Sequence, residues 1–153
     1  MSIILKRDHD LYVVCVGGGV FSKVEIDEFS NLGVLQKVLR FDLCDEELAC
    51  SYNNAQLFVF PSLYEGFGIP ILEAFECRCP IACSNTSSLP EVAGDAAAYF
   101  DPYDVGSIHS TIEKLLYNKE LALAFIEKGE NRLKQFSFEK TAKETLRIYK
   151  ELL

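Results

Sequence analysis

Two carboxylates eight residues apart are the side chains of this sequence best suited to bind a ligand. Glu65 belongs to the segment Glu65-Gly66-Phe67-Gly68, and Glu73 follows in a predicted helix. An ionised carboxylate accepts hydrogen bonds from two hydroxyl groups, and glycine allows tight turns and a close approach of the backbone to a ligand. The pair therefore predicts a site for a ligand that carries several hydroxyl groups.

The elements that position these acids are predicted between residues 57 and 83. The apolar run at 57–60 is typical of a strand buried on both faces. Pro70 suits the first turn of a helix, where its missing N–H is no loss. We expect that helix to continue over residues 71–77 and the next strand to begin over 80–83. Open α/β sheets bind ligands outside the carboxyl ends of their strands, which is where this order places both acids.

An anion is also expected at the start of this helix. The first N–H groups of a helix lack partners within the helix, and the helix dipole favours negative charge beside them. A ligand with both hydroxyl groups and phosphates satisfies the acids and the helix together. A sugar nucleotide is such a ligand.

The rest of the chain alternates short apolar strands with helices. Further strands are predicted at 11–16, 37–41 and 97–100, and helices at 22–31, 45–52 and 89–92, with the tail of a helix at 2–10. This alternation predicts a single α/β domain over residues 1–153, with a doubly wound, parallel, Rossmann-like sheet of five strands. Residues 104–153 are predicted to be helical, with apolar stripes that pack on the core or on another domain.

Helix caps are predicted at four positions. Ser22 and Glu25 have the spacing of a capping box. Asp45, Asp104 and Ser137 each stand at the start of a predicted helix and are expected to cap it.

A run of three glycines follows the first predicted strand. Gly17 and Gly18 are candidates for a backbone turn that lies close to a phosphate. The run lacks the full spacing of a dinucleotide-binding motif, so a tight turn between strand and helix explains it equally well. Both interpretations stay open.

Composition excludes several classes of protein. The net charge of −8 argues against nucleic acid as a partner, because a phosphate-binding face needs clustered Lys and Arg. No apolar run approaches the ~20 residues that a membrane-spanning helix needs, and the first residues do not have the layout of a signal peptide. A cytoplasmic protein is expected, with peripheral membrane contact left open.

The six cysteines are expected to be reduced and mostly buried. They lack the paired C-x2-C spacing of a zinc site, and both histidines lie far from the cluster formed by Cys77, Cys79 and Cys83. Small apolar behaviour in the core is the usual role of such residues. A metal or redox role is the alternative.

The segments PSLYEGFGIPILEA, SNTSSLPEVAGDAA and YFDPYD closely resemble the donor-binding region of family-4 (group 1) retaining glycosyltransferases. These enzymes have the two-domain GT-B architecture, and the resemblance runs from about residue 11 to the C-terminus. It implies transfer of a sugar from a UDP-, GDP- or ADP-linked donor to an acceptor hydroxyl with retention of configuration, and no metal cofactor. By the same resemblance Glu65 is the catalytic residue that orients the sugar, and Glu73 holds the ribose. The other donor-binding positions that it implies are Gly66, Phe67, Gly68, Ile69, Pro70, Ile71, Gly17 and Gly18.

The resemblance also implies that the chain covers only the C-terminal part of such an enzyme. The Arg and Lys that neutralise the diphosphate, the first strand of the sheet and the acceptor-binding N-terminal domain are expected upstream of it. Without that strand, the strands at 11–16 and 57–60 are expected to lack their common neighbour. Arg78 stands where a glycine is usual, at some conformational cost if its backbone is left-handed. Little turnover is expected from this chain alone.

Two other functions remain possible at this stage. One is a non-catalytic, nucleotide-sugar-binding or interaction module that pairs with a separate N-terminal polypeptide. The other is a sugar-nucleotide epimerase, which shares the architecture but needs acid and base groups that the sequence does not show.

Overall fold

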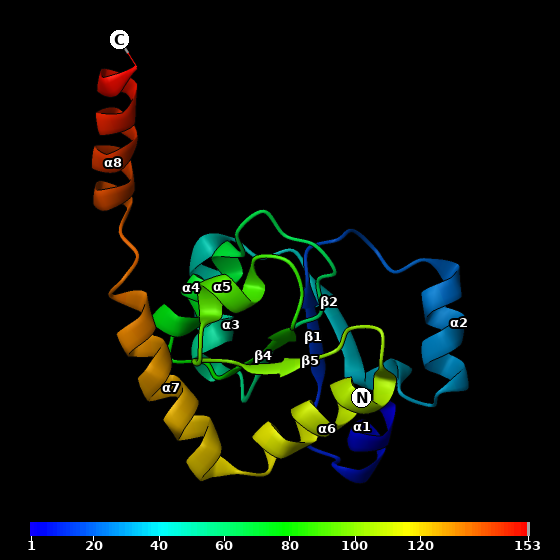
Figure 1. The fold of residues 1–153 in the computed structure, drawn as a ribbon. Helices are drawn as coiled ribbons and strands as arrows, with labels where there is room; N and C mark the ends of the chain where they lie inside the picture. The colour runs from blue at the N-terminus through cyan, green and yellow to red at the C-terminus, as the bar shows by residue number, and fades with distance from the viewer. Residues whose placement is uncertain (153) are drawn as a thin grey trace.

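The computed structural model describes residues 1–152, and its helices and strands alternate as predicted (Figure 1). All five strands are short, and each is followed by a helix. The elements in chain order are α1 (Ser2–Arg7), β1 (Val13–Val16), α2 (Lys23–Asn31), a 3-10 turn (Leu35–Lys37), β2 (Val38–Phe41), α3 (Asp45–Asn54), β3 (Phe58–Phe60), α4 (Ile69–Glu76), β4 (Ile81–Ser84), α5 (Leu89–Ala93), β5 (Ala98–Phe100), α6 (Val105–Leu116), α7 (Lys119–Leu133) and α8 (Phe138–Glu151).

The parallel sheet is interrupted between β1 and β3. β1 pairs with β2, with Val13 opposite Val38, and β3, β4 and β5 form a second parallel sheet in that order. Within residues 1–152, β1 and β3 do not pair with each other. The α/β class with parallel strands is confirmed, and so is the expected lack of a common neighbour for these two strands.

The strand at 57–60 is not buried on both faces, which corrects the prediction from its apolar run. β3 is an edge strand in this structure, and its three residues are only half-buried. The fully buried strand is β4, which lies between β3 and β5 and has all four residues buried. The apolar run therefore predicted the strand correctly, but it did not reveal that one edge of β3 lacks a neighbouring strand.

Three of the four predicted caps are confirmed. The Ser22 hydroxyl accepts from the Glu25 N–H at 3.3 Å while the Glu25 carboxylate accepts from the Ser22 N–H at 2.8 Å. Asp104 and Ser137 cap α6 and α8. Asp45 is not the cap of α3 but its first helical residue. The N-cap is Cys44, the residue before it. The Cys44 N–H donates at 3.0 Å to the carboxylate of Glu47, the third residue of the helix.

The N-terminal helix holds the two sheets together. Ile4 is fully buried with Ala82, Phe100 and Ile112, in a cluster that also contains Leu11 from the approach to β1. An ion pair of 2.6 Å joins Arg7 to Glu113 of α6. Burial of apolar surface and this pair therefore connect the β1–β2 half to the β3–β4–β5 half.

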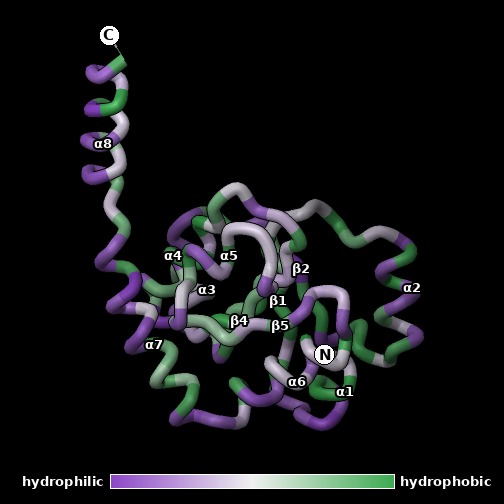
Figure 2. The backbone as a smooth tube through the Cα atoms, in the orientation of Figure 1, coloured by the Kyte–Doolittle hydropathy of each residue, from purple (hydrophilic) through white to green (hydrophobic). Residues whose placement is uncertain are grey.

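The region from 104 onward is helical as predicted, but its last helix is not part of the core. α6 packs on β5, and α7 packs on α4 and α6. α8 extends away from the body of the molecule, with charged and apolar residues alternating along it (Figures 1 and 2). None of its described residues is buried, and Phe138 at its start is 92% exposed.

The cysteines differ in burial more than the sequence predicts. Cys79 and Cys83 are buried and Cys15 and Cys77 half-buried, while Cys44 is exposed, as is Cys50, so the expectation of mostly buried cysteines is wrong. Burial raises the pKa of Cys79 to about 11 and that of Cys83 to about 12.

Alkylation with iodoacetamide at pH 8 is expected to modify the two exposed cysteines first, because the thiolate is the nucleophile. Mass spectrometry should show Cys44 and Cys50 labelled within minutes, and Cys79 and Cys83 labelled only in urea. Fast labelling of Cys83 in the folded protein would contradict the packing around β4.

Candidate functional site

The loop between β3 and α4 carries the first of the two acids. Glu65 is half-buried there, and Gly68 ends the loop as the residue immediately before α4. Gly68 has φ +104° and ψ +49°, and a Cβ built on it would lie 2.9 Å from Cδ2 of Leu89. Its carbonyl accepts from the Ile71 N–H at 2.9 Å, which starts the helix. Gly68 is therefore the turning point that directs the chain from the loop into α4.

Helix α4 presents the second acid. Ile71, Ala74 and Phe75 are buried and anchor one side of the helix in the core, and Glu73 is half-buried on its second turn. Pro70 occupies the first turn as predicted, and no side chain of the described residues caps that turn. Pro70 has no N–H and the Ile71 N–H already donates to the Gly68 carbonyl, so the Ile69 N–H is the amide of this turn that is available to an anion.

Tyr52 of α3 fixes the Glu73 carboxylate, a contact that the sequence analysis missed. Its phenol donates to Oε2 of Glu73 at 3.3 Å, and its ring stacks edge-on against Phe58 with 5.1 Å between ring centroids. Burial raises the pKa of Tyr52 strongly, and the Glu73 charge and hydrogen bond raise it further. The phenol therefore stays protonated, and the second Glu73 oxygen remains free to accept from a ligand. The apolar side of the predicted 45–52 helix was the only sequence signal that Tyr52 faces the core.

If the site binds the sugar nucleotide that the sequence predicts, replacing Tyr52 with phenylalanine is expected to weaken that binding about two- to tenfold, the cost of one hydrogen bond that orients an acceptor. The melting temperature should change little, because the ring remains and water can reach the half-buried carboxylate. Calorimetric titration and thermal denaturation of both proteins test this together. Unchanged affinity would remove Tyr52 from the site.

Hydroxyl groups of the β4–α5 loop hold the Glu65 loop in place. The Thr86 hydroxyl donates to the Leu63 carbonyl at 3.1 Å, and the Ser87 hydroxyl donates to the Glu65 carbonyl at 2.8 Å. The Ser88 hydroxyl lies 2.9 Å from the Glu65 carbonyl and 2.8 Å from that of Phe67.

The end of α7 and the segment that follows it support the same loop from another side. The Phe67 ring meets the Phe136 ring edge-on, with centroids 5.8 Å apart, and the Arg132 guanidinium lies 5.2 Å from the Phe136 centroid. Arg132 Nε also donates to the Val92 carbonyl at 2.9 Å, at the end of α5. The helical region thus contributes to the position of Phe67.

The Gly17–Gly18 turn follows a strand of the β1–β2 sheet, whereas the Glu65 loop follows a strand of the β3–β4–β5 sheet. Both residues have φ +77°, and the Gly17 N–H donates to the Phe41 carbonyl at 3.1 Å, which ties the turn to the end of β2. The turn follows the carboxyl end of β1, and the Glu65 loop follows that of β3; both segments lie along the upper side of the main body in Figure 1, below α8. The structure shows no hydrogen bond between them within residues 1–152.

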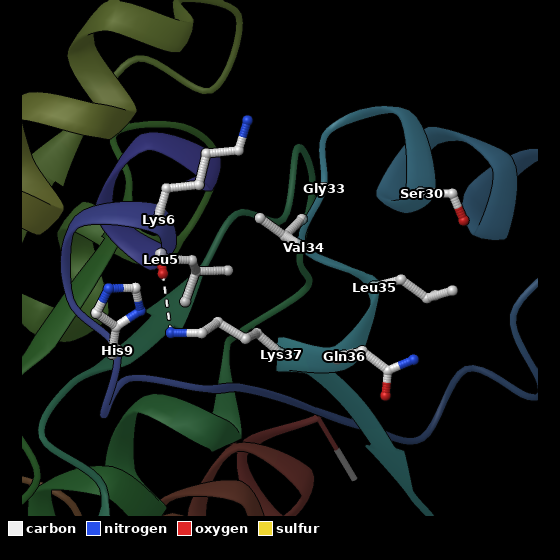
Figure 3. A pocket seen from close by; sticks show the side chains of 9 residues that line it. All are labelled: Leu5, Lys6, His9, Ser30, Gly33, Val34, Leu35, Gln36 and Lys37. Carbon is white, nitrogen blue, oxygen red and sulfur yellow. Dashed lines mark hydrogen bonds between the residues drawn. The ribbon is translucent and has the colours of Figure 1, made fainter.

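A cavity of about 450 Å³ lies elsewhere, beside α1 and the 3-10 turn (Figure 3). It is lined by Leu5, Lys6, His9, Ser30, Gly33, Val34, Leu35, Gln36 and Lys37. Lys37 precedes β2, so this cavity is at the amino end of that strand, whereas parallel sheets bind ligands at the carboxyl ends. The Lys37 ammonium already donates to the Leu5 and Asp8 carbonyls at 2.9 and 2.8 Å. The cavity is thus a poor candidate for the donor site.

A second cavity, of about 520 Å³, lies between α4 and α7, and neither Glu65 nor Glu73 lines it. Both acids are half-buried. Among the described residues, no three His, Cys, Asp or Glu side chains gather as a metal site. No described helix has the length and apolar character needed to cross a membrane.

Comparison with known proteins shows which family this chain resembles. The family model described as "Glycosyl transferases group 1" matches residues 1–132. O-antigen chain mannosyltransferase B of Escherichia coli is 47% identical over 111 residues, which are 71% of this chain and 28% of that protein. MMP alpha-(1->4)-mannosyltransferase of Mycolicibacterium hassiacum is 33% identical over 72% of this chain and 28% of its own length.

The fold comparison agrees. The crystal structure of Anabaena Alr3699/HepE in complex with UDP matches with a TM-score of 0.78, at 15% identity, over 99% of this chain and 44% of that one. This chain spans 28% of the length of the first relative above. The parallel α/β fold, the family model and the identity to the two mannosyltransferases together show that the chain belongs to the group 1 glycosyltransferases.

Proposed function

We propose that this chain binds the donor of a retaining, family-4 glycosyl transfer, a nucleoside-diphosphate sugar, at the start of α4. The observation that carries the proposal is the Glu73 carboxylate, which Tyr52 fixes through one oxygen on the second turn of a helix whose first turn no described side chain caps. The free oxygen of Glu73 would accept from a ribose hydroxyl, and the Ile69 N–H at the start of α4 would face the diphosphate.

Glu65 has a positioning role in this proposal. Its carboxylate would accept from hydroxyls of the transferred sugar and hold the sugar in the geometry for attack by the acceptor. Departure of the diphosphate needs stabilisation of the charge that develops on it, and the Ile69 N–H together with the α4 dipole would supply part of this stabilisation. Gly66, Phe67, Ile69 and the Gly17–Gly18 turn would form the backbone around sugar and phosphates. No metal enters this scheme, because the Ile69 amide and the Arg and Lys expected upstream of this chain can carry the charge.

Mannose is the sugar that we propose. Two relatives that are at least 30% identical over more than two thirds of this chain are named as mannosyltransferases. A family of transferases also favours transfer over epimerisation. Exposed free thiols at Cys44 and Cys50 suit a reducing compartment, so we place the reaction in the cytoplasm.

The complete reaction would need a second, N-terminal GT-B domain, on the same polypeptide or on a separate one. The interrupted sheet supports this: Val14 and Val16 of β1 are 49% and 42% exposed, and their register partners Leu39 and Phe41 of β2 are 38% and 46% exposed. Parallel strands are normally covered on both faces. A strand between β1 and β3 would pair with the edges of both, and a further domain that carries the acceptor site would cover this apolar face. The 153-residue chain by itself is expected to bind donor without turning it over.

Calorimetry with GDP-mannose, UDP-glucose and ADP-glucose tests the proposal. GDP-mannose is expected to bind most tightly, and Glu73→Ala is expected to weaken that binding ~10–100-fold, the cost of losing hydrogen bonds to a charged acceptor. Glu76→Ala is the matched control, because Glu76 is an exposed acid on the same helix. Equal affinities of the Glu73→Ala variant and the unmodified chain would contradict the proposed site.

A further inference from the structure

Both backbone polar groups of Glu65 pair with side chains from one other loop. The Glu65 N–H donates to Oγ of Ser87 at 3.3 Å, and the Ser87 hydroxyl donates back to the Glu65 carbonyl at 2.8 Å. Ser88 lies 2.9 Å from the same carbonyl, so both lone pairs of this oxygen have a hydroxyl partner. Twenty-two residues separate Glu65 from Ser87, so these are contacts between two loops and not a local turn.

Ser87 adopts a backbone conformation that disfavours a side chain. Its φ is +56°, and Arg78 is the only other non-glycine residue with a positive φ among the described residues. Glycine would adopt this conformation without cost. With serine there, the left-handed backbone places the hydroxyl where it can both accept from and donate to Glu65.

The hydrogen bonds of Ser87 and Ser88 to the Glu65 loop together form what we call the serine clamp. Ser88 extends this clamp to Phe67, the residue after Gly66. Its single hydroxyl proton is shared between the Glu65 and Phe67 carbonyls, at 2.9 and 2.8 Å. Gly66 lies between these carbonyls, and a Cβ built on it would meet nothing within 4 Å, so no side-chain packing holds this position. The two serines therefore set the direction in which the Glu65 side chain leaves the loop.

We propose that Ser87 and Ser88 are positioning residues for Glu65 and thereby control how the donor sugar, rather than the nucleotide, is held. This inference rests on the proposed function of Glu65. The nucleotide side of the site depends on Glu73 and Tyr52, which lie on helices that these serines do not contact through hydrogen bonds. Loss of the clamp should therefore weaken binding of the sugar part of the donor more than binding of its nucleotide part.

The variants that test the clamp separate the hydroxyl from the backbone. Ser87→Gly removes the hydroxyl while it relieves the positive φ, so a general loss of folding is not expected. Ser88→Ala removes the second hydroxyl, and Ser88→Thr retains one as a rescue. Ser110→Ala is the matched control, because the Ser110 hydroxyl donates to the Ser107 carbonyl at 3.0 Å on α6, in another part of the molecule.

The first readout needs no ligand. Amide hydrogen exchange of Glu65, measured by NMR, is expected to accelerate at least tenfold in Ser87→Gly and to stay unchanged in Ser110→Ala. Unchanged exchange at Glu65 in Ser87→Gly would overturn the clamp.

The second readout compares GDP-mannose with GDP. Ser87→Gly and Ser88→Ala are expected to weaken GDP-mannose about two- to tenfold while GDP changes less than twofold, and Ser88→Thr should restore the affinity for GDP-mannose. Equal weakening of both ligands would show a merely structural role and overturn the proposal. If the unmodified chain binds GDP and GDP-mannose equally while Glu65 exchange still accelerates in Ser87→Gly, the clamp stands and the sugar-contacting role of Glu65 is wrong.

Discussion

Gly68→Ala is expected to destabilise the fold by ~2–4 kcal/mol and to abolish measurable donor binding. A side chain at φ +104° costs ~1–3 kcal/mol in backbone strain. The added Cβ would also lie 2.9 Å from a methyl group of the fully buried Leu89, and overpacking of this kind costs ~1–3 kcal/mol. The melting temperature should fall by ~5–12 °C, measured by calorimetry or circular dichroism. Binding is expected to be lost because Gly68 directs the chain into α4, so its displacement would move the start of the helix that carries Glu73.

Gly66→Ala is the control for this variant. Gly66 belongs to the same motif, but its φ is not positive and a Cβ there has nothing within 4 Å. Its stability is expected to stay within ~0.5 kcal/mol of the unmodified chain. Equal damage from the two substitutions would show that the loop geometry described here is wrong.

Gly129→Ala is expected to destabilise the protein by ~1–2 kcal/mol although it improves helix propensity. Alanine in a helix interior is favoured over glycine by ~1 kcal/mol. Gly129, however, is a buried position of α7, and a Cβ there would lie 2.6 Å from Cδ1 of Phe75, a ring atom in the core. The overpacking outweighs the propensity, and Gly129→Val should cost ~3 kcal/mol or more.

Urea denaturation of Gly129→Ala, Gly129→Val and Glu127→Ala tests this prediction. Glu127 is exposed on the same helix, so its substitution should change the free energy of unfolding by less than ~0.5 kcal/mol. A stabilising Gly129→Ala would mean that α7 does not pack on α4 as described. Because α4 carries Glu73, the contact between these helices also supports the site.

The order of elements was predictable from the sequence because local signals encode it. Apolar runs at the strands, the Ser22–Glu25 capping box and the Asp104 cap all act within a few residues, and the structure confirms each of them. The cap of α3 was predicted one residue late, since the Glu47 carboxylate that completes it was not considered. Burial of β3 was overestimated for a different reason: whether a strand has two neighbours depends on chain topology and not on its own residues.

The contacts that position the two acids could not be predicted from spacing. The Tyr52–Glu73 bond joins residues 21 apart, and the Ser87 bonds to Glu65 join residues 22 apart. Ser and Thr in a loop need no partner at all, so the sequence of the β4–α5 loop did not reveal its hydrogen bonds to the Glu65 loop. Likewise, the two glycines of the motif look equivalent in sequence, and only the backbone angles distinguish Gly68 from Gly66.

An NMR titration of the ¹⁵N-labelled chain with GDP-mannose tests the central claim most directly. The claim is that Glu65 and Glu73 serve one donor site at the start of α4. We predict that the amide signals of residues 65–69, 71 and 73 shift together, with a single dissociation constant, and that Glu73→Ala removes these shifts. Shifts confined to the cavity around Lys6 and Lys37, with residues 65–73 unchanged, would contradict it.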